Sequence, residues 1–200
     1  MELTVVNKYI GKDVIGYVVM TRISNDAKNE VSEIQARIAE KFKDSVYCLP
    51  KDSLHVTFMD WISPFAEYDK DKDVLFEEIF PNYNSALEKS IANSGAINVH
   101  FNAIEVYPDA IILIGQDGGK YNEIREKFVS EADLIKDAKK PPQIVHITIC
   151  RFLKEVSVLD VKNFIKEITV DIDEKVYNFE LIRVARSPLS KYSIVKKYDL

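Results

Sequence analysis

The chain alternates between short apolar runs and longer segments whose apolar residues recur at helical spacing. Apolar residues at every second position, or in brief runs rich in β-branched residues, are typical of strands. This pattern predicts a leading arm or short strand at residues 3–6. It predicts further strands at residues 15–23, 46–49, 54–61, 97–106, 110–114, 144–152, 176–185 and 192–197.

Apolar residues spaced three and four apart predict amphipathic helices between these strands. The expected helices cover residues 29–43, 74–93, 119–132 and 158–168. Pro81 is expected to begin, kink or split the second of them, because proline lacks a backbone N–H.

The order of these elements repeats coarsely, since each half of the chain ends in a strand that carries a histidine. A strand and a helix precede the first such strand, and a hairpin and a helix precede the second. We therefore expect one α+β domain over residues 1–200, built from two similar lobes that share a cleft. Residues 1–14 would form an N-terminal arm or an extra strand.

The two histidine-bearing strands share a motif. Residues 53–58 read Ser-Leu-His-Val-Thr-Phe, and residues 144–150 read Ile-Val-His-Ile-Thr-Ile-Cys. Residues i and i+2 of a strand point to the same face, so His55 is expected beside Thr57 and His146 beside Thr148. The chain has only three histidines, so two such pairs in matching apolar contexts indicate a shared function more than two unrelated core strands.

Two imidazoles and two hydroxyls facing one cleft suit acid–base chemistry on a phosphodiester. Free histidine titrates near neutral pH, so one ring can accept a proton while the other donates one. The hydroxyls can donate hydrogen bonds to the non-bridging oxygens of the phosphate. The residues predict a metal-free phosphodiesterase without a cofactor, because the histidines and the two cysteines lack the ligand spacing of a zinc site.

Composition limits the cellular compartment and the binding partners that we expect for this protein. The net charge of −5 argues against binding long duplex nucleic acid. Two cysteines, no evident signal peptide and no long apolar segment favour a soluble cytoplasmic protein without a membrane partner. Residues 181–200 carry five basic side chains against Asp199 alone, and this local charge either attracts a small anionic ligand or marks a solvated strand face.

The paired His-x-Thr strands resemble those of the two-histidine (2H) phosphoesterase superfamily, and their surroundings are similar to its LigT-like branch. Supporting features are Tyr107 and Pro108 midway in the hairpin, Arg151 three residues after the second motif threonine, and the closing strand pair. The resemblance covers about residues 15–198. The chain departs from the branch just before the second histidine, where Ile144 and Val145 replace its frequent basic residue and proline.

The resemblance implies a bilobal fold with the motif strands facing each other across a central groove. It implies that His55 and His146 act as acid and base, and that Thr57 and Thr148 hold phosphate oxygens. The expected substrate is a small nucleotide, an oligonucleotide or an RNA end. A 2′,3′-cyclic phosphate is the first choice, and a 2′-5′-linked or cyclic oligonucleotide is the second. A non-catalytic binder of RNA ends or phosphoribose is the alternative from another class, and a monomer is the favoured oligomeric state.

Other residues remain open between a binding role and a packing role. Tyr107, Trp61 and Tyr192 could stack on a nucleobase or could pack in the core or the hairpins. Arg151 is a further candidate for substrate binding, although regular strand geometry turns it away from the groove. The same geometry places Cys150 on the motif face, where it would fill the groove or core. The segment 116–120 with its two glycines favours a turn over a phosphate cradle, and His100 is expected to be structural or exposed.

Overall fold

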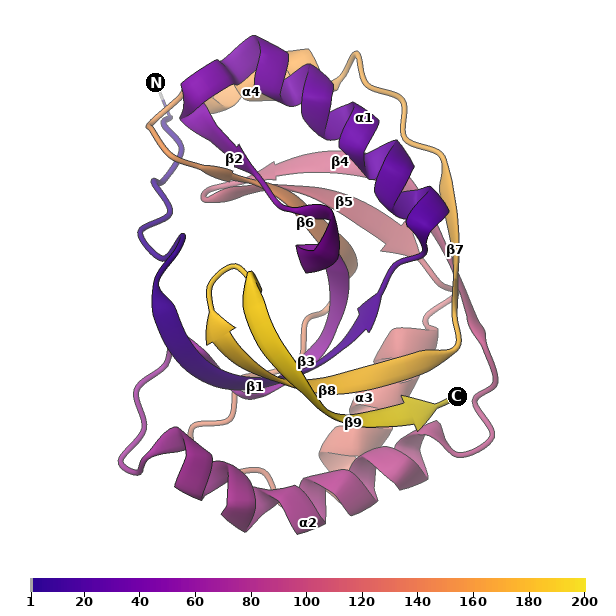
Figure 1. The fold of residues 1–200 in the computed structure, drawn as a ribbon. Helices are drawn as coiled ribbons and strands as arrows, with labels where there is room; N and C mark the ends of the chain where they lie inside the picture. The colour runs from indigo at the N-terminus through magenta and orange to yellow at the C-terminus, as the bar shows by residue number, and fades with distance from the viewer. Residues whose placement is uncertain (1) are drawn as a thin grey trace.

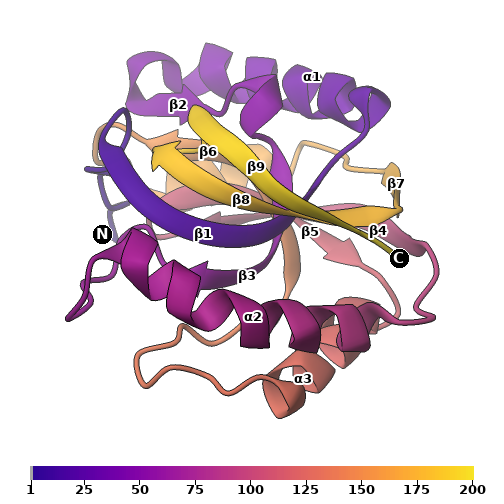
Figure 2. The same ribbon diagram turned by 60° about the horizontal axis from the view of Figure 1, so that its bottom comes forward.

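A single antiparallel sheet of nine strands curls between two layers of helices in the computed structural model, which describes residues 2–200 (Figures 1 and 2). The strands are β1 (Asp13–Arg22), β2 (Val46–Cys48), β3 (His55–Ile62), β4 (Ile97–Tyr107), β5 (Ala110–Gln116), β6 (Val145–Phe152), β7 (Ile172–Val176), β8 (Asn178–Arg186) and β9 (Lys191–Asp199). The helices are α1 (Asn25–Phe42), α2 (Lys72–Ile91), α3 (Lys120–Glu131) and α4 (Val158–Ile165), with single 3₁₀ turns at Lys43–Ser45 and Lys51–Ser53.

The sheet consists of two lobes that meet at the two motif strands. The strand order is β7-β4-β5-β6-β3-β1-β8-β9, and the short β2 also pairs with β6. We call the first four strands of this order, with β2, the β6 lobe, and the last four the β3 lobe. The lobes are joined by little ladder pairing, because only Val56 and Ile147 are paired between β3 and β6. The expected bilobal α+β fold is confirmed.

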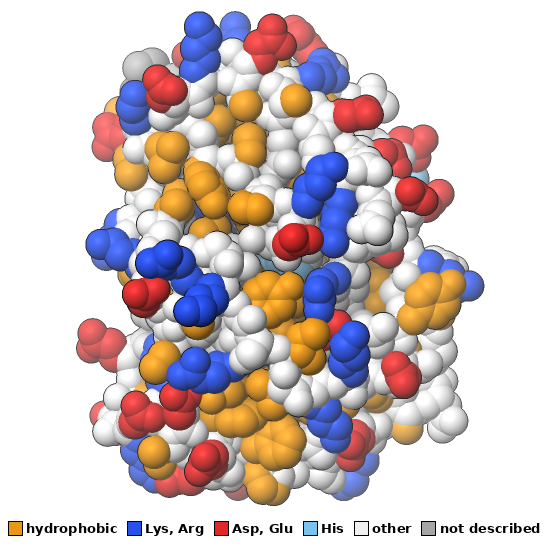
Figure 3. Space-filling view, viewed as in Figure 1, with side chains coloured by type: hydrophobic (Ala, Val, Ile, Leu, Met, Phe, Trp, Pro, Cys, Tyr) orange, Lys and Arg blue, Asp and Glu red, His pale blue; other side chains and the backbone are white. Residues whose placement is uncertain are grey.

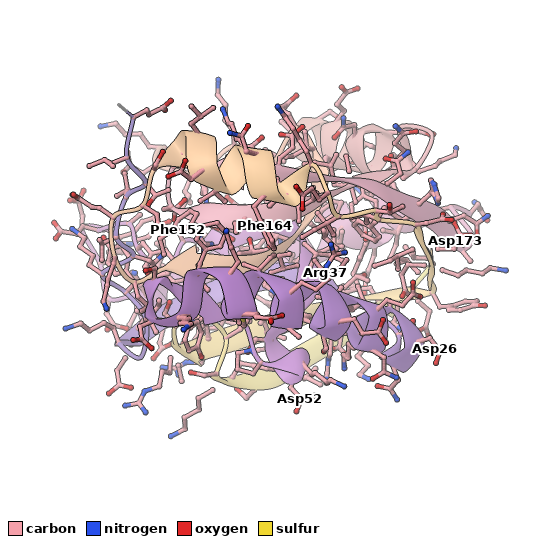
Figure 4. The ribbon with its side chains drawn as sticks, turned by 90° about the horizontal axis from the view of Figure 1, so that it is seen from above. Asp26, Arg37, Asp52, Phe152, Phe164 and Asp173 are labelled. Carbon is pink, nitrogen blue, oxygen red and sulfur yellow. The ribbon has the colours of Figure 1, made fainter. Side chains whose placement is uncertain are left out.

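Each lobe is covered by a pair of helices. Helices α1 and α4 contact strands of the β6 lobe, whereas α2 and α3 contact strands of the β3 lobe (Figures 1 and 2). Figure 4 shows α1 and α4 side by side, where the rings of Phe42 and Phe164 meet edge to face at 5.5 Å and Arg37 donates to the Glu167 carbonyl. Helix α1 follows a strand of the β3 lobe and α3 follows a strand of the β6 lobe, so these helices cross over and tie the lobes together.

Helix boundaries differ from the sequence prediction where caps decide them. The first helix begins at Asn25, four residues early, because the Ser24 side chain accepts a hydrogen bond from the Ala27 N–H. Asp71 caps α2 in the same way, and this helix continues through Pro81 without splitting. Strand β7 was not predicted, because its buried Glu174 interrupts the apolar alternation that would identify it.

Both motif strands contain a β-bulge immediately after the motif threonine. In β3, Thr57 is opposite Met20 and Met59 is opposite Val19, which leaves Phe58 as the extra residue. In β6, Thr148 is opposite Ile112 and Cys150 is opposite Ile111, so Ile149 is extra. A bulge resets the alternation of faces, and this changes which residues reach the cleft.

Candidate active site

The two His-x-Thr motifs line one cleft between the lobes. A cavity of about 380 Å³ is bordered by His55, Thr57, His146 and Thr148, together with residues from the N-terminal arm and from the loop after β8. All four motif side chains are half-buried, whereas the intervening Val56 and Ile147 are buried, as period-two alternation requires. In the space-filling view, histidine surface is visible near the centre of the molecule, between charged and apolar side chains (Figure 3).

The ring of His55 is held on both sides. Its Nδ1 lies 2.7 Å from the Ser53 carbonyl oxygen, and its Nε2 lies 3.1 Å from Oγ1 of Thr57. A carbonyl can only accept, so Nδ1 carries a proton, and in the neutral ring Nε2 accepts a hydrogen bond from the Thr57 hydroxyl. Desolvation lowers the pKa of His55, while the Ser53 carbonyl and the Asp60 carboxylate oppose this shift.

The ring of His146 has a less complete set of partners. Burial, and then the neighbouring charge of His55, lower the pKa of His146 to about 4. The Ile144 carbonyl, two residues earlier as in the first motif, opposes the shift. Within residues 2–200, however, no acceptor reaches its buried Nδ1 with regular hydrogen-bond geometry. Both rings are therefore neutral at pH 7 in the free protein.

The bulges bring a charged residue of each motif strand into the cleft. Arg151 and Asp60, each three residues after a motif threonine, both line the cavity. The prediction that Arg151 points away was wrong, because the extra residue Ile149 shifts it onto the face of Thr148. The same shift turns Cys150 into the core, where it is fully buried, so it does not share the motif face.

The two charges are paired differently. Arg151 forms an ion pair with Asp109 in the turn between β4 and β5. Asp60 lies 2.9 Å from Nζ of Lys139, in the loop before β6. Two ion pairs, Arg151–Asp109 and Asp60–Lys139, thus line the cleft.

The N-terminal arm contributes a wall of the cleft. Backbone hydrogen bonds from Val5 to the Pro108 carbonyl and from Asn7 to the Phe152 carbonyl fix its course. This places Asn7 and Tyr9 at the cavity. The arm was predicted, but its contribution to the site was not, because no local sequence signal marks it.

The aromatic residues at the cleft are not the predicted ones. Trp61 is fully buried, Tyr107 is exposed at the end of the β4–β5 hairpin, and Tyr192 packs near Arg22, so none of the three lines the cavity. Tyr9 and Phe65 do line it, with ring centroids 4.4 Å apart and Phe65 48% exposed.

The loop that carries Phe65 packs closely against the backbone of β1. A Cβ added at Gly16 on β1 would lie 2.6 Å from Cγ of Pro64, so only glycine lets Pro64 pack against the strand. Pro64 precedes Phe65 and also lines the cavity. Gly16 therefore fixes the loop that presents Phe65 to the cleft.

Three other candidate features lie outside the cleft. The basic side chains near the C-terminus are mostly paired with carboxylates of other elements; these pairs are Arg183–Asp73, Arg186–Asp13, Lys196–Glu88 and Lys197–Glu180. Residues 116–120 form a turn in which the Asp117 carboxylate accepts from Gly119 and Tyr121, and His100 pairs with Asp173. Most of the positive charge near the C-terminus is thus balanced by carboxylates of the protein itself.

The part of the chain that the structure describes holds neither a metal-binding cluster nor a membrane-spanning helix. Among residues 2–200, no three or more His, Cys, Asp or Glu side chains cluster closely enough to hold a metal ion. None of the helices described over the same residues has the length and apolar character needed to cross a membrane.

Solved structures share this architecture. The protein TT0787 of Thermus thermophilus superposes with a TM-score of 0.62 at 14% identity, covering 92% of this chain and 97% of that one. E. coli LigT with 3′-AMP gives 0.60 at 10% identity, covering 94% and 98%. A structure described as a phosphoesterase gives 0.62 at 12%, covering 93% and 98%. No protein-family model and no curated protein matches the sequence. The chain has the fold of the LigT-like 2H phosphoesterases, as its paired motifs predicted.

Proposed function

We propose that this protein is a metal-independent 2H phosphodiesterase whose cleft cleaves a nucleotide or RNA-end phosphodiester. The observation that carries the proposal is the joint placement of both His-x-Thr motifs on one cavity, from strands 91 positions apart in sequence. Two imidazoles on one cavity can serve as base and acid, and the hydroxyls and Arg151 can hold phosphate oxygens.

The two rings are suited to different roles. The lowered pKa of His146 leaves its ring unprotonated at neutral pH, so it is available to accept a proton. The imidazolium form of His55 is supported by the Ser53 carbonyl and the Asp60 carboxylate, which suits the acid. The negative charge of a bound phosphodiester raises the pKa of His55, so that Nε2 takes up a proton from solvent before the reaction. With a 2′,3′-cyclic phosphate, His146 would then take a proton from the attacking water while Nε2 of His55 gives its proton to the departing ribose oxygen.

A nucleotide is the favoured substrate class. The half-buried ring of Tyr9 and the exposed ring of Phe65 both line the cleft and provide faces on which a base can stack. LigT, which shares the fold, is described in complexes with 3′-AMP, ATP, NADP+ and phosphate. A terminal 2′,3′-cyclic phosphate is small enough for the cavity and remains our first choice.

One observation favours a longer substrate as the second candidate. A further cavity of about 580 Å³ lies beneath the loop after α3 and shares Lys139 and Pro142 with the cleft. Lys136 and Lys140 also border it, so it could accept a second nucleotide of a 2′-5′-linked or cyclic oligonucleotide.

Product analysis tests these choices. The wild-type protein and a His55→Ala/His146→Ala double variant are incubated in EDTA with 2′,3′-cyclic nucleotides, 2′-5′ oligoadenylate and cyclic dinucleotides, and the products are identified by mass. We expect the wild type to convert a cyclic phosphate to a monophosphate and the double variant to be inactive. Binding of these ligands without turnover from pH 5 to 8 would indicate a non-catalytic binder, and activity lost on chelation would contradict the metal-independent mechanism.

A further inference from the structure

Arg125 on α3 is a charged side chain in the protein interior. It is 2% exposed and does not line the cleft, although it borders the adjoining cavity of about 580 Å³ beside the loop after α3. Among residues 2–200, its hydrogen bonds all go to neutral oxygen atoms. A buried cation without a carboxylate partner is costly, so its position calls for a physical reason.

The guanidinium of Arg125 connects the backbones of the two motif strands. Its Nη2 donates to the Thr57 carbonyl at 2.8 Å and its Nε to the Phe58 carbonyl at 2.9 Å. Its Nη1 reaches the Ile144 carbonyl at 3.4 Å and Oδ1 of Asn122 at 3.1 Å. One planar group thus contacts the bulge of the first motif and the residue two positions before His146.

This is the region where the sheet itself provides least support. Strands β3 and β6 share a single residue pair, while six pairs join β5 to β6 and six join β1 to β3. The bulge at Phe58 interrupts the ladder on the other side of β3. The separation of the two motifs therefore depends on contacts outside the ladder, and Arg125 makes such contacts.

The charge of Arg125 persists despite its burial. Desolvation lowers its pKa to about 10, which leaves it protonated at neutral pH. The rings of Tyr121 and Phe58 lie 5.2 and 5.8 Å from its central carbon and add cation–π stabilisation. Its positive charge also lowers the pKa of His146, so it favours both a neutral base and an anionic ligand in the cleft.

We propose that Arg125 is a positioning residue for the reaction, holding the two His-x-Thr motifs at a fixed separation and placing a permanent positive charge behind the phosphate site. The inference rests on the proposed phosphodiesterase function. It assigns to Arg125 no contact with the phosphate in the cleft, which Arg125 does not line. A small misplacement of reacting groups can cost about 100-fold in rate, so the consequence for turnover is expected to be large.

The test compares Arg125→Gln, which removes the charge, with Arg125→Lys, which keeps it but loses the planar fork. Arg37→Gln is the matched control, because Arg37 also donates to a backbone carbonyl but lies exposed on α1, in the other lobe. The readouts are kcat and KM on the best substrate, the pH profile, and the pKa of His146 from NMR titration, which requires no activity.

We expect Arg125→Gln to lower kcat roughly 10- to 100-fold with a smaller change in KM, and to raise the pKa of His146 by a measurable amount. Arg125→Lys should leave that pKa near the wild-type value while losing part of kcat, and Arg37→Gln should change neither. If Arg125→Gln does not fold, Arg125→Lys decides through kcat alone, and a wild-type kcat in that variant would overturn the proposal. An unchanged His146 pKa and kcat in folded Arg125→Gln would also overturn it, whereas an inactive wild type would count against the phosphodiesterase function instead.

Discussion

The two motif strands have nearly the same backbone but opposite charges. Each places a histidine two residues after a nearby carbonyl, a threonine two residues later and a bulge immediately after that. Three residues after the threonine, however, β3 carries Asp60 and β6 carries Arg151. The imidazole of His55 is also hydrogen-bonded on both nitrogens, while Nδ1 of His146 lacks a regular partner among residues 2–200. A repeated scaffold can thus hold two chemically different halves of one site.

Removing either imidazole should have the largest effect. His55→Ala or His146→Ala is expected to lower kcat/KM by about 10² to 10⁴, because each ring transfers a proton in the transition state. Rates on the best substrate from the product screen provide the measurement, with His100→Ala as the control, since His100 lies outside the cleft. Wild-type rates in either single variant would show that the two motifs do not act together.

Arg151 is the next most sensitive position. Arg151→Met should lower kcat/KM roughly 10- to 100-fold, because a charge-assisted hydrogen bond to the phosphate is lost. Arg186→Met serves as control, since Arg186 also pairs with an aspartate but does not line the cleft. Equal activities of the two variants would remove Arg151 from the site.

Asp60 occupies on β3 the place that Arg151 occupies on β6, so removing its charge should have the opposite effect on substrate binding. Asp60→Asn removes the negative charge that faces the cleft and should lower KM for an anionic substrate a few-fold. It should also lower the pKa of His55 further, since the carboxylate raises that pKa. A higher KM in this variant would indicate that the Asp60–Lys139 pair is needed to shape the cleft.

The aromatic rings of Tyr9 and Phe65 at the cleft are expected to affect substrate binding more than the chemical step. Phe65→Ala should raise KM about tenfold with little change in kcat, because stacking on one base is worth about 1–3 kcal/mol. Tyr177→Ala is a suitable control, since Tyr177 is an exposed aromatic residue outside the cleft. An unchanged KM for Phe65→Ala would place the base elsewhere.

The smallest expected effect concerns stability in acid. His146 has a pKa of about 4 in the folded protein against about 6.5 when unfolded, so the unfolded state binds more protons between these values. Stability should therefore fall as the pH decreases through this window. His146→Gln, which cannot be protonated, should lose less stability than the wild type between pH 7.5 and pH 5 in urea denaturation, and an equal loss would contradict the lowered pKa.

The sequence predicted the paired motifs because a period of two is a local property of a strand. The residues that complete the site depend on features without a local signal. Neither Phe58 nor Ile149 is a residue type that marks a bulge, so Asp60 could not be assigned to the cleft and Arg151 was assigned to the wrong face. Tyr9 reaches the cleft only through backbone contacts of the arm with distant segments.

The burial of Trp61 shows the same limit for aromatic residues. Its ring stacks on Phe128 and meets Tyr83 edge to face, so it belongs to the packing between β3 and the α2–α3 pair. Sequence spacing placed it on a motif strand but could not show that these helices would cover it. The helices cover it because α3 crosses from the β6 lobe to the β3 lobe.

Whether both imidazoles address one phosphorus atom can be measured directly by NMR titration of the histidine rings with inorganic phosphate at pH 6. We predict that the resonances of His55 and His146 shift together with one dissociation constant, that both pKa values rise in the complex, and that His100 does not respond. Shifts confined to one ring, or two different dissociation constants, would contradict a shared phosphate site.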